Sequence, residues 1–181
     1  MKTITVFGSS RPVEGDPEFT TAYEVGKHLA KAGFSVCNGG YGGIMTASAR
    51  GSKEAGGSTI GVTADQLRKG ANKWIDQEIR KRDLVERLLK LVELGDGYVV
   101  LKGGTGTLLE LACVWEFVNK GILRVKPIVV VGSFWKDVIA TLSGEALWEG
   151  LGDCTKFIQQ VETPEECANI LRKDFSDHHL I

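Results

Sequence analysis

The feature that most constrains the fold of this chain is a regular alternation of short, β-rich apolar runs with longer stretches of helical periodicity. The apolar runs stand at residues 4–8, 34–38, 58–62, 97–101, 127–131 and 157–161, and helices are expected over about 18–31, 43–55, 79–94, from about 107, and over 164–173. Nearly continuous apolar strands separated by helices are typical of a parallel sheet that helices cover on both faces. We therefore predict an α/β fold, a Rossmann-like doubly wound parallel sheet, with residues 1–181 in a single domain.

The composition favours a soluble protein whose partner is a small molecule. Of the residues, 43% are hydrophobic and 25% charged, and the formal net charge is −1. A chain so close to neutrality has no overall electrostatic attraction to nucleic acid or to an anionic membrane. The amino-terminal apolar run is broken at Gly8, too early for a signal peptide, and no run approaches the ~20 apolar residues of a membrane span. These observations predict a cytoplasmic location.

The cysteines and histidines form no recognisable metal or disulfide pattern. The four cysteines, at positions 37, 113, 154 and 167, lack the paired spacing of zinc ligands, and the three histidines stand at positions 28, 178 and 179. Such scattered positions predict buried, reduced thiols, and no bound metal.

Three glycine-rich loops follow predicted strands and should meet at one edge of the sheet: residues 8–11 (GSSR), 38–43 (NGGYGG) and 102–107 (KGGTGT). Glycine lets the backbone approach an anion closely, and the next helix offers unpaired N–H groups, so the loops are candidate phosphate cradles. Alternatively they are only tight strand-to-helix turns. None has the GxGxxG spacing of an NAD site, and no GxxxxGK[ST] run occurs, so the expected site is mononucleotide-sized. Residues 63–76, which show no clear element, are either a flap over the site or an edge strand and turn.

Two charged positions stand in apolar surroundings. Glu110 follows Thr107 by three residues, which predicts a T-x-x-E capping box, yet an acid in the first turn of this helix would also face the ligand. In the predicted helix 79–94, Arg80 and Arg87 project from an apolar arc. A buried guanidinium needs a carboxylate or a bound anion, or must extend to solvent, so a structural ion pair is the simpler interpretation.

The motifs together resemble those of the Lonely Guy (LOG) family, often labelled as possible lysine decarboxylases, whose signature is PGGxGTxxE. Here the signature reads KGGTGTLLE, over residues 102–110, and the resemblance includes the GSS turn, GGYGGIM at 39–45 and the arginine-bearing helix. It covers residues 2–142 and leaves 143–181 as a C-terminal extension. The same fold superfamily includes molybdenum cofactor carrier proteins.

The resemblance implies a hydrolase that cleaves the N-glycosidic bond of AMP or cytokinin nucleotides, giving free base and ribose 5-phosphate without metal or cofactor. Glu110 and Arg87 match the family's catalytic acid and arginine. The implied substrate- and phosphate-binding residues are Gly8, Ser9, Gly40, Gly43, Met45, Gly103, Gly104, Thr105, Gly106 and Thr107. The alternative is a nucleotide or molybdenum cofactor binding protein without turnover, in which Glu110 only caps the helix.

Further expectations follow from the family resemblance and from the positions at which this sequence departs from the family signature. The signature proline is Lys102 here, and nothing near this lysine suggests a pyridoxal phosphate site, so we reject decarboxylation. Family members are commonly homodimers, which makes the helix with Trp115 and Phe117 a candidate interface. For protonation of the leaving base, the candidate acids are Asp16, Asp83 or a residue of the possible flap at 63–76.

Overall fold

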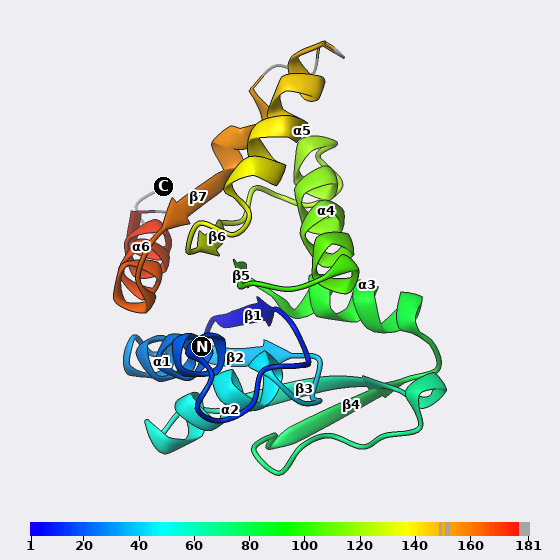
Figure 1. Ribbon diagram of the computed structural model, residues 1–181, viewed down its shortest axis with the longest axis vertical. Coiled ribbons are helices and arrows are strands. Elements are labelled where there is room, and N and C mark those ends of the chain that lie inside the picture. The colour runs from blue at the N-terminus through cyan, green and yellow to red at the C-terminus, as the bar shows by residue number, and fades with distance from the viewer. Residues whose placement is uncertain (149, 151–152, 178–181) are drawn as a thin grey trace.

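The computed structural model describes residues 1–148, 150 and 153–177, and contains one seven-stranded parallel sheet in the order β4-β3-β2-β1-β5-β6-β7 (Figure 1). The elements are β1 (Thr3–Phe7), α1 (Pro17–Lys31), β2 (Ser35–Asn38), α2 (Ile44–Glu54), β3 (Thr59–Ala64), the 3-10 helix η1 (Asp65–Leu67), β4 (Gln77–Lys81), α3 (Leu84–Leu94), β5 (Gly97–Val100), α4 (Thr105–Asn119), β6 (Ile128–Val131), α5 (Lys136–Trp148), the 3-10 helix η2 (Cys154–Phe157), β7 (Ile158–Val161) and α6 (Pro164–Asp177). The predicted α/β Rossmann-like fold is confirmed.

The strand order places a topological switch point at the centre of the sheet. From β1 the chain adds strands outward to β4, then returns to the other side of β1 with β5, which pairs in register from Ile4–Gly97 to Phe7–Val100. In open α/β sheets, ligands bind beyond the carboxyl ends of the strands where the order reverses. The loops after β1 and β5 therefore frame the expected site.

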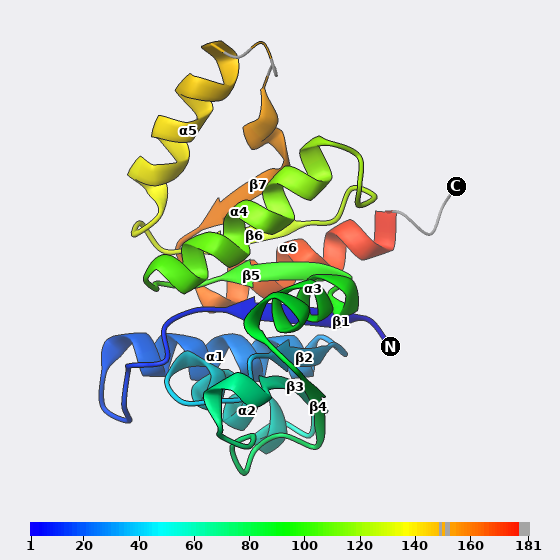
Figure 2. The same ribbon diagram turned by 90° about the vertical axis from the view of Figure 1, so that its right-hand side faces the viewer.

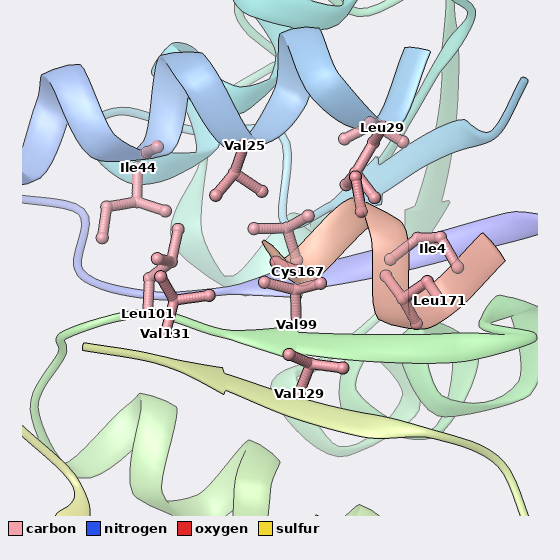
Figure 3. Packing of buried hydrophobic residues seen from close by; sticks show 14 of the residues in the cluster. Ile4, Val25, Leu29, Ile44, Val99, Leu101, Val129, Val131, Cys167 and Leu171 are labelled. Atoms are coloured by element: carbon pink, nitrogen blue, oxygen red, sulfur yellow. The ribbon is translucent and has the colours of Figure 1, made fainter. Parts of the chain in front are cut away.

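Helices cover both faces of the sheet and enclose two apolar cores. On one face α1, α2 and α6 pack on the sheet, and Val25, Leu29, Val99 and Leu171 meet there (Figure 3). The other face carries α3, α4 and α5 (Figure 2). The core on that face includes Phe7, Tyr98 and Leu111. Because both faces are covered, the central strands are almost wholly apolar, which explains the runs seen in the sequence.

The predicted helix over residues 79–94 is wrong in its first part. Residues Gln77–Lys81 form strand β4, which pairs with β3 in parallel register, so that Ile79 lies beside Val62. Helix α3 begins only at Leu84, because the side chain of Asp83 accepts hydrogen bonds from the N–H groups of the first helical turn. A polar sequence with one half-buried apolar residue is typical of an edge strand, where charges hinder pairing with other chains.

Arg80 therefore belongs to β4 and not to the arginine pair expected on a helix. It is exposed and forms surface ion pairs with Asp65 at 3.7 Å and Glu78 at 3.4 Å. Exposed pairs of this kind contribute only ~0–1 kcal/mol, so Arg80 has a solvated structural role.

Strand β7 and helix α6 complete the sheet and one of its faces. Strand β7 pairs with β6 from Ile128–Ile158 to Val131–Val161, and Cys167 and Leu171 of α6 are fully buried against the sheet (Figure 3). His178 and His179 lie outside the described residues. The four cysteines are free thiols, three buried and Cys113 half-buried. No helix within the described part of the chain is long and apolar enough to cross a membrane.

Candidate active site

A cavity of about 390 Å³ opens at the carboxyl edge of β1 and β5, at the switch point. Its walls come from the loop after β1, the glycine loop after β2, the start of α2, η1, α3 and the first two turns of α4. The lining residues are Gly8, Ser9, Ser10, Arg11, Tyr41, Met45, Leu67, Arg87, Gly104, Thr105, Gly106, Thr107 and Glu110. Its volume lies in the range of ~300–1,000 Å³ that is usual for small-molecule sites.

The N-terminus of α4 provides free backbone donors to this cavity. The helix begins at Thr105 with Gly104 as its N-cap, and its first intrahelical bond runs from Leu108 N–H to the Gly104 carbonyl, at 3.0 Å. The N–H groups of residues 105–107 therefore have no partner within the helix. A Cβ atom added at Gly104 or Gly106 would have no other atom within 4 Å, so both glycines border open space. This arrangement suits an anion.

The predicted capping box is wrong. The N-cap is Gly104, three residues before Thr107, and no side-chain hydrogen bond caps the helix. Thr107 is 4% exposed, and Gly103 leaves the space beside its hydroxyl. Glu110 is consequently not engaged in capping.

Glu110 lies in the second turn of α4 with its carboxyl at the cavity. Its side chain is 15% exposed and, within the described residues, has one ionic contact, to Arg87 at 3.8 Å between Oε1 and Nη1. That distance is too long for a hydrogen bond. Burial raises the pKa of Glu110 to about 7, and the positive charge of Arg87 opposes the rise. The carboxyl thus exchanges its proton near neutral pH and keeps its oxygens free for a ligand.

Arg87 reaches the cavity from the first turns of α3 across the end of β3. Its Nε donates to the Val62 carbonyl at 2.8 Å, and its guanidinium lies 5.5 Å from the centre of the Tyr41 ring. A methyl group at Gly39 would overlap this guanidinium, so glycine at that position makes room for it. The Val62 carbonyl, the Tyr41 ring and the backbone at Gly39 thus surround the guanidinium. Its Nη1 atom lies towards Glu110.

The structure gathers most, but not all, of the predicted site residues at the cavity. Nine of the twelve line it; Gly40, Gly43 and Gly103 do not. Gly43 has φ 63° and packs against the backbone of the β1 loop, whose Ser9 carbonyl accepts the N–H of Ile44 at 2.9 Å. Gly40 has φ 76° and its N–H donates to the Asn38 side chain. These glycines shape the loops behind the cavity, and their role in binding stays a prediction.

Four further lining residues were not predicted individually, although they lie within the loops 8–11 and 38–43 and the segment 63–76 noted in the sequence: Ser10, Arg11, Tyr41 and Leu67. Tyr41 stands inside the GGYGG loop, and Arg11 directly follows the GSS turn, so position next to a glycine turn was the available signal. Leu67 comes from η1 within the unassigned segment 63–76, which places that segment at the cavity while the strand after it forms the sheet edge.

The candidate acids for the leaving base do not line this cavity. Asp83 caps α3, and Asp16 accepts the Val13 N–H at 2.9 Å and borders a neighbouring hollow. Glu110 is the sole acid among the cavity's described lining residues. Nor do the described residues contain a group of three or more His, Cys, Asp or Glu side chains that could hold a metal ion.

Trp115, expected at an interface, lies in the core instead. It is 5% exposed, and its indole N–H donates to the Cys154 carbonyl at 2.9 Å. The helices that supply Arg87 and Glu110 carry exposed apolar residues, Leu84, Val85 and Leu89 on α3 and Leu109 on α4.

Comparison with known proteins shows the family and the fold of this chain. The model of the SLOG cluster4 family matches residues 1–164. A cytokinin riboside 5′-monophosphate phosphoribohydrolase of Mycobacterium tuberculosis is 34% identical over 134 residues, which cover 71% of this chain and 70% of the relative.

Two solved structures are similar over nearly the whole chain. The X-ray structure of the structural-genomics target TM1055 has a TM-score of 0.76 and 27% identity, covering 96% of this chain and 99% of that one. A molybdenum cofactor binding protein from Rippkaea orientalis has a TM-score of 0.73 and 23% identity, covering 96% and 97%. At 23% identity the second likeness concerns the fold alone.

Proposed function

The chain belongs to the SLOG cluster4 family, and from this premise we propose that it is a nucleoside 5′-monophosphate phosphoribohydrolase of the LOG type. It would hydrolyse the N-glycosidic bond of AMP or of cytokinin nucleotides and release the free base and ribose 5-phosphate. The mycobacterial relative with 34% identity, whose name states this activity, supports the reaction class.

The observation that carries the proposal is the state of Glu110: a carboxyl at the cavity, without a cap to make, with a pKa raised to about 7 by burial. Glycosidic cleavage passes through a ribosyl cation with oxocarbenium character. An ionised carboxylate beside C1′ stabilises that cation, and it also accepts a proton from the attacking water. A purely structural carboxyl would not need a buried position at a cavity, because burial destabilises its ionised form.

The backbone at the start of α4 supplies the other half of the site. The free N–H groups of residues 105–107 would hold the 5′-phosphate, and the positive end of the helix favours its charge. Because Glu110 lies one turn further along the same helix, a bound phosphate places the ribose towards the carboxyl. Arg87 keeps the carboxyl oriented and lowers its pKa, so that more of it is ionised at neutral pH.

In the proposed step water forms a bond to C1′ and the C1′–N bond breaks, with its electron pair leaving on the base. One water proton passes to Glu110. Since no second acid is among the described lining residues, the departing nitrogen takes its proton from solvent or from Glu110 itself.

The test is release of free base from AMP and from N6-modified AMP, followed by chromatography. Glu110→Gln should lower the release rate by at least about a hundredfold, while the affinity for AMP, measured by calorimetry, changes only a few-fold. Glu116→Gln, the same change at an exposed position of α4, is the matched control and should keep full activity. If the wild-type protein binds AMP but releases no base, the proposal fails.

That failure would favour a second function, a non-catalytic nucleotide or molybdenum cofactor binding protein. The observation in its favour is that the described cavity wall holds a single acid, whereas glycosidases generally use two. In that case neither the wild type nor Glu110→Gln would release base from any tested nucleotide, and the substitution would leave binding unaltered.

A further inference from the structure

Two further hollows continue the candidate active site along the carboxyl edge of the sheet. The first, about 280 Å³, shares Ser9 and Arg11 with the main cavity and is closed by Lys102, Gly103 and Phe134, among others. The second, about 370 Å³, shares Lys102 and Phe134 with the first and extends past the ends of β5 and β6. Because they share lining residues, the two hollows adjoin the main cavity one after the other and form an extension of it along this edge of the sheet.

The walls of this extension carry cationic groups suited to a second phosphate. Arg11 is exposed and forms no ion pair with any other described residue. The ammonium of Lys102 is 2.6 Å from Glu18, which uses one of its three donors. Asp16, the other acid of the first hollow, already accepts the N–H of Val13. A third acid, Glu162, lines the second hollow. The cationic side chains of the extension are Arg11 in the first hollow and Lys102, which lines both.

An exposed aromatic ring lies beyond these cations. Phe134 is 47% exposed, its ring packs edge-on against Trp135 with 5.0 Å between centroids, and Lys102 lies 5.8 Å from its centre. A fixed ring with an open surface can stack a second ring system. Lys102, which stands where the LOG signature has proline, and Phe134 are features that cleavage of a nucleoside monophosphate does not use.

We propose that Arg11, Lys102 and Phe134 form a second subsite, and that the ligand is a nucleoside 5′-diphosphate whose outer phosphate carries another ring. The inner phosphate would bind at residues 105–107, with its nucleoside towards Glu110. The outer phosphate would lie between Arg11 and Lys102, and the second ring would stack on Phe134. This rests on the proposed function, because it takes the nucleotide orientation from there.

The test measures the dissociation constants of AMP, ADP and diadenosine diphosphate by calorimetry, with base release from AMP followed in parallel. In the wild-type protein ADP and the dinucleotide should bind at least about tenfold more tightly than AMP. Lys102→Ala should reduce the preference for both over AMP by about five- to tenfold, whereas Phe134→Ala should reduce it for the dinucleotide only. Lys31→Ala, the same charge loss at an exposed position at the end of α1, should leave every ratio unchanged.

The outcomes separate the two proposals. If the wild-type ratios are near one, or neither variant changes them, the subsite is disproved even when AMP is hydrolysed. If the ratios behave as expected but no base is released from AMP, the subsite stands and the hydrolase activity does not. Because Lys102 and Phe134 are exposed, both variants should fold, and their far-UV circular dichroism should match that of the wild type.

Discussion

Replacing Glu110 by glutamine should stabilise the protein above neutral pH while abolishing base release. Burial raises the pKa of this carboxyl from 4.5 to about 7, so the folded protein holds its proton more tightly than the unfolded chain does. Below pH ~4.5 the carboxyl is protonated in both states and contributes no pH dependence. Between pH ~4.5 and ~7 the unfolded chain ionises first, so stability falls as the pH rises.

The total loss of stability follows from the difference in the pKa of Glu110 between the folded and unfolded states. At 1.36 kcal/mol per pKa unit, ionising the buried carboxyl lowers the free energy of unfolding by about 3 kcal/mol above pH ~7. Glutamine removes the charge but leaves an amide without a hydrogen-bond partner, which costs ~1 kcal/mol. The expected net gain at pH 8.5 is about 1–3 kcal/mol, and at pH 5 it is near zero or slightly negative.

Thermal unfolding of both proteins at pH 5 and pH 8.5, followed by circular dichroism, measures this gain. For a chain of 181 residues, each kcal/mol moves the midpoint by about 2–4 °C, so the variant should melt about 3–9 °C higher at pH 8.5 only. Glu116→Gln, exposed on the same helix, should show no such pH-dependent difference. Equal shifts of Glu110→Gln at both pH values would refute the assignment of a buried, proton-holding carboxyl.

Three further perturbations test the surroundings of this carboxyl. Arg87→Met removes the charge that lowers its pKa, so the acidic limb of the pH–rate profile, expected near pH 7, should move to higher pH; an unmoved limb would place the titration elsewhere. Gly39→Ala should displace the guanidinium and lower kcat at least about tenfold, whereas Gly144→Ala, where a methyl group meets nothing within 4 Å, should not. We also propose a homodimer through the exposed apolar residues of α3: Val85→Asp should halve the mass measured by light scattering, and Val13→Asp, equally exposed on a loop, should leave it unchanged. A monomeric wild-type protein would contradict this.

The central strands could be predicted from the sequence and the edge strand could not, for one physical reason. Strands β1, β5 and β6 are covered on both faces, so their residues are apolar almost throughout. Strand β4 has a neighbour on one side only, and four of its five residues are polar. Its single apolar residue, Ile79, also fits the helical period of the residues after it. Periodicity alone therefore extended the helix by five residues, across the Asp83 cap.

The start of α4 shows a second limit. A threonine followed three residues later by glutamate is the usual sign of a capping box. Here the helix starts in the glycine loop, because Gly104 adopts the N-cap conformation without a side-chain acceptor. The same difference in start position decides the chemistry. In a capping box, the Glu110 carboxylate would accept a hydrogen bond from the backbone N–H of Thr107. In the structure the helix has no side-chain cap, and the carboxyl is available to a ligand.

The sequence predicts that Arg87 meets a charged partner, but it does not predict the route of the side chain. An arginine within an apolar arc needs a carboxylate or an anion, and Glu110 is that carboxylate. The apolar periodicity does not indicate how the guanidinium reaches it. The guanidinium passes the end of β3, bonds the Val62 carbonyl and occupies the space left by Gly39. The glycine loop after β2 thus acts on the site by leaving room for an arginine from another element, which no local pattern in the loop could indicate.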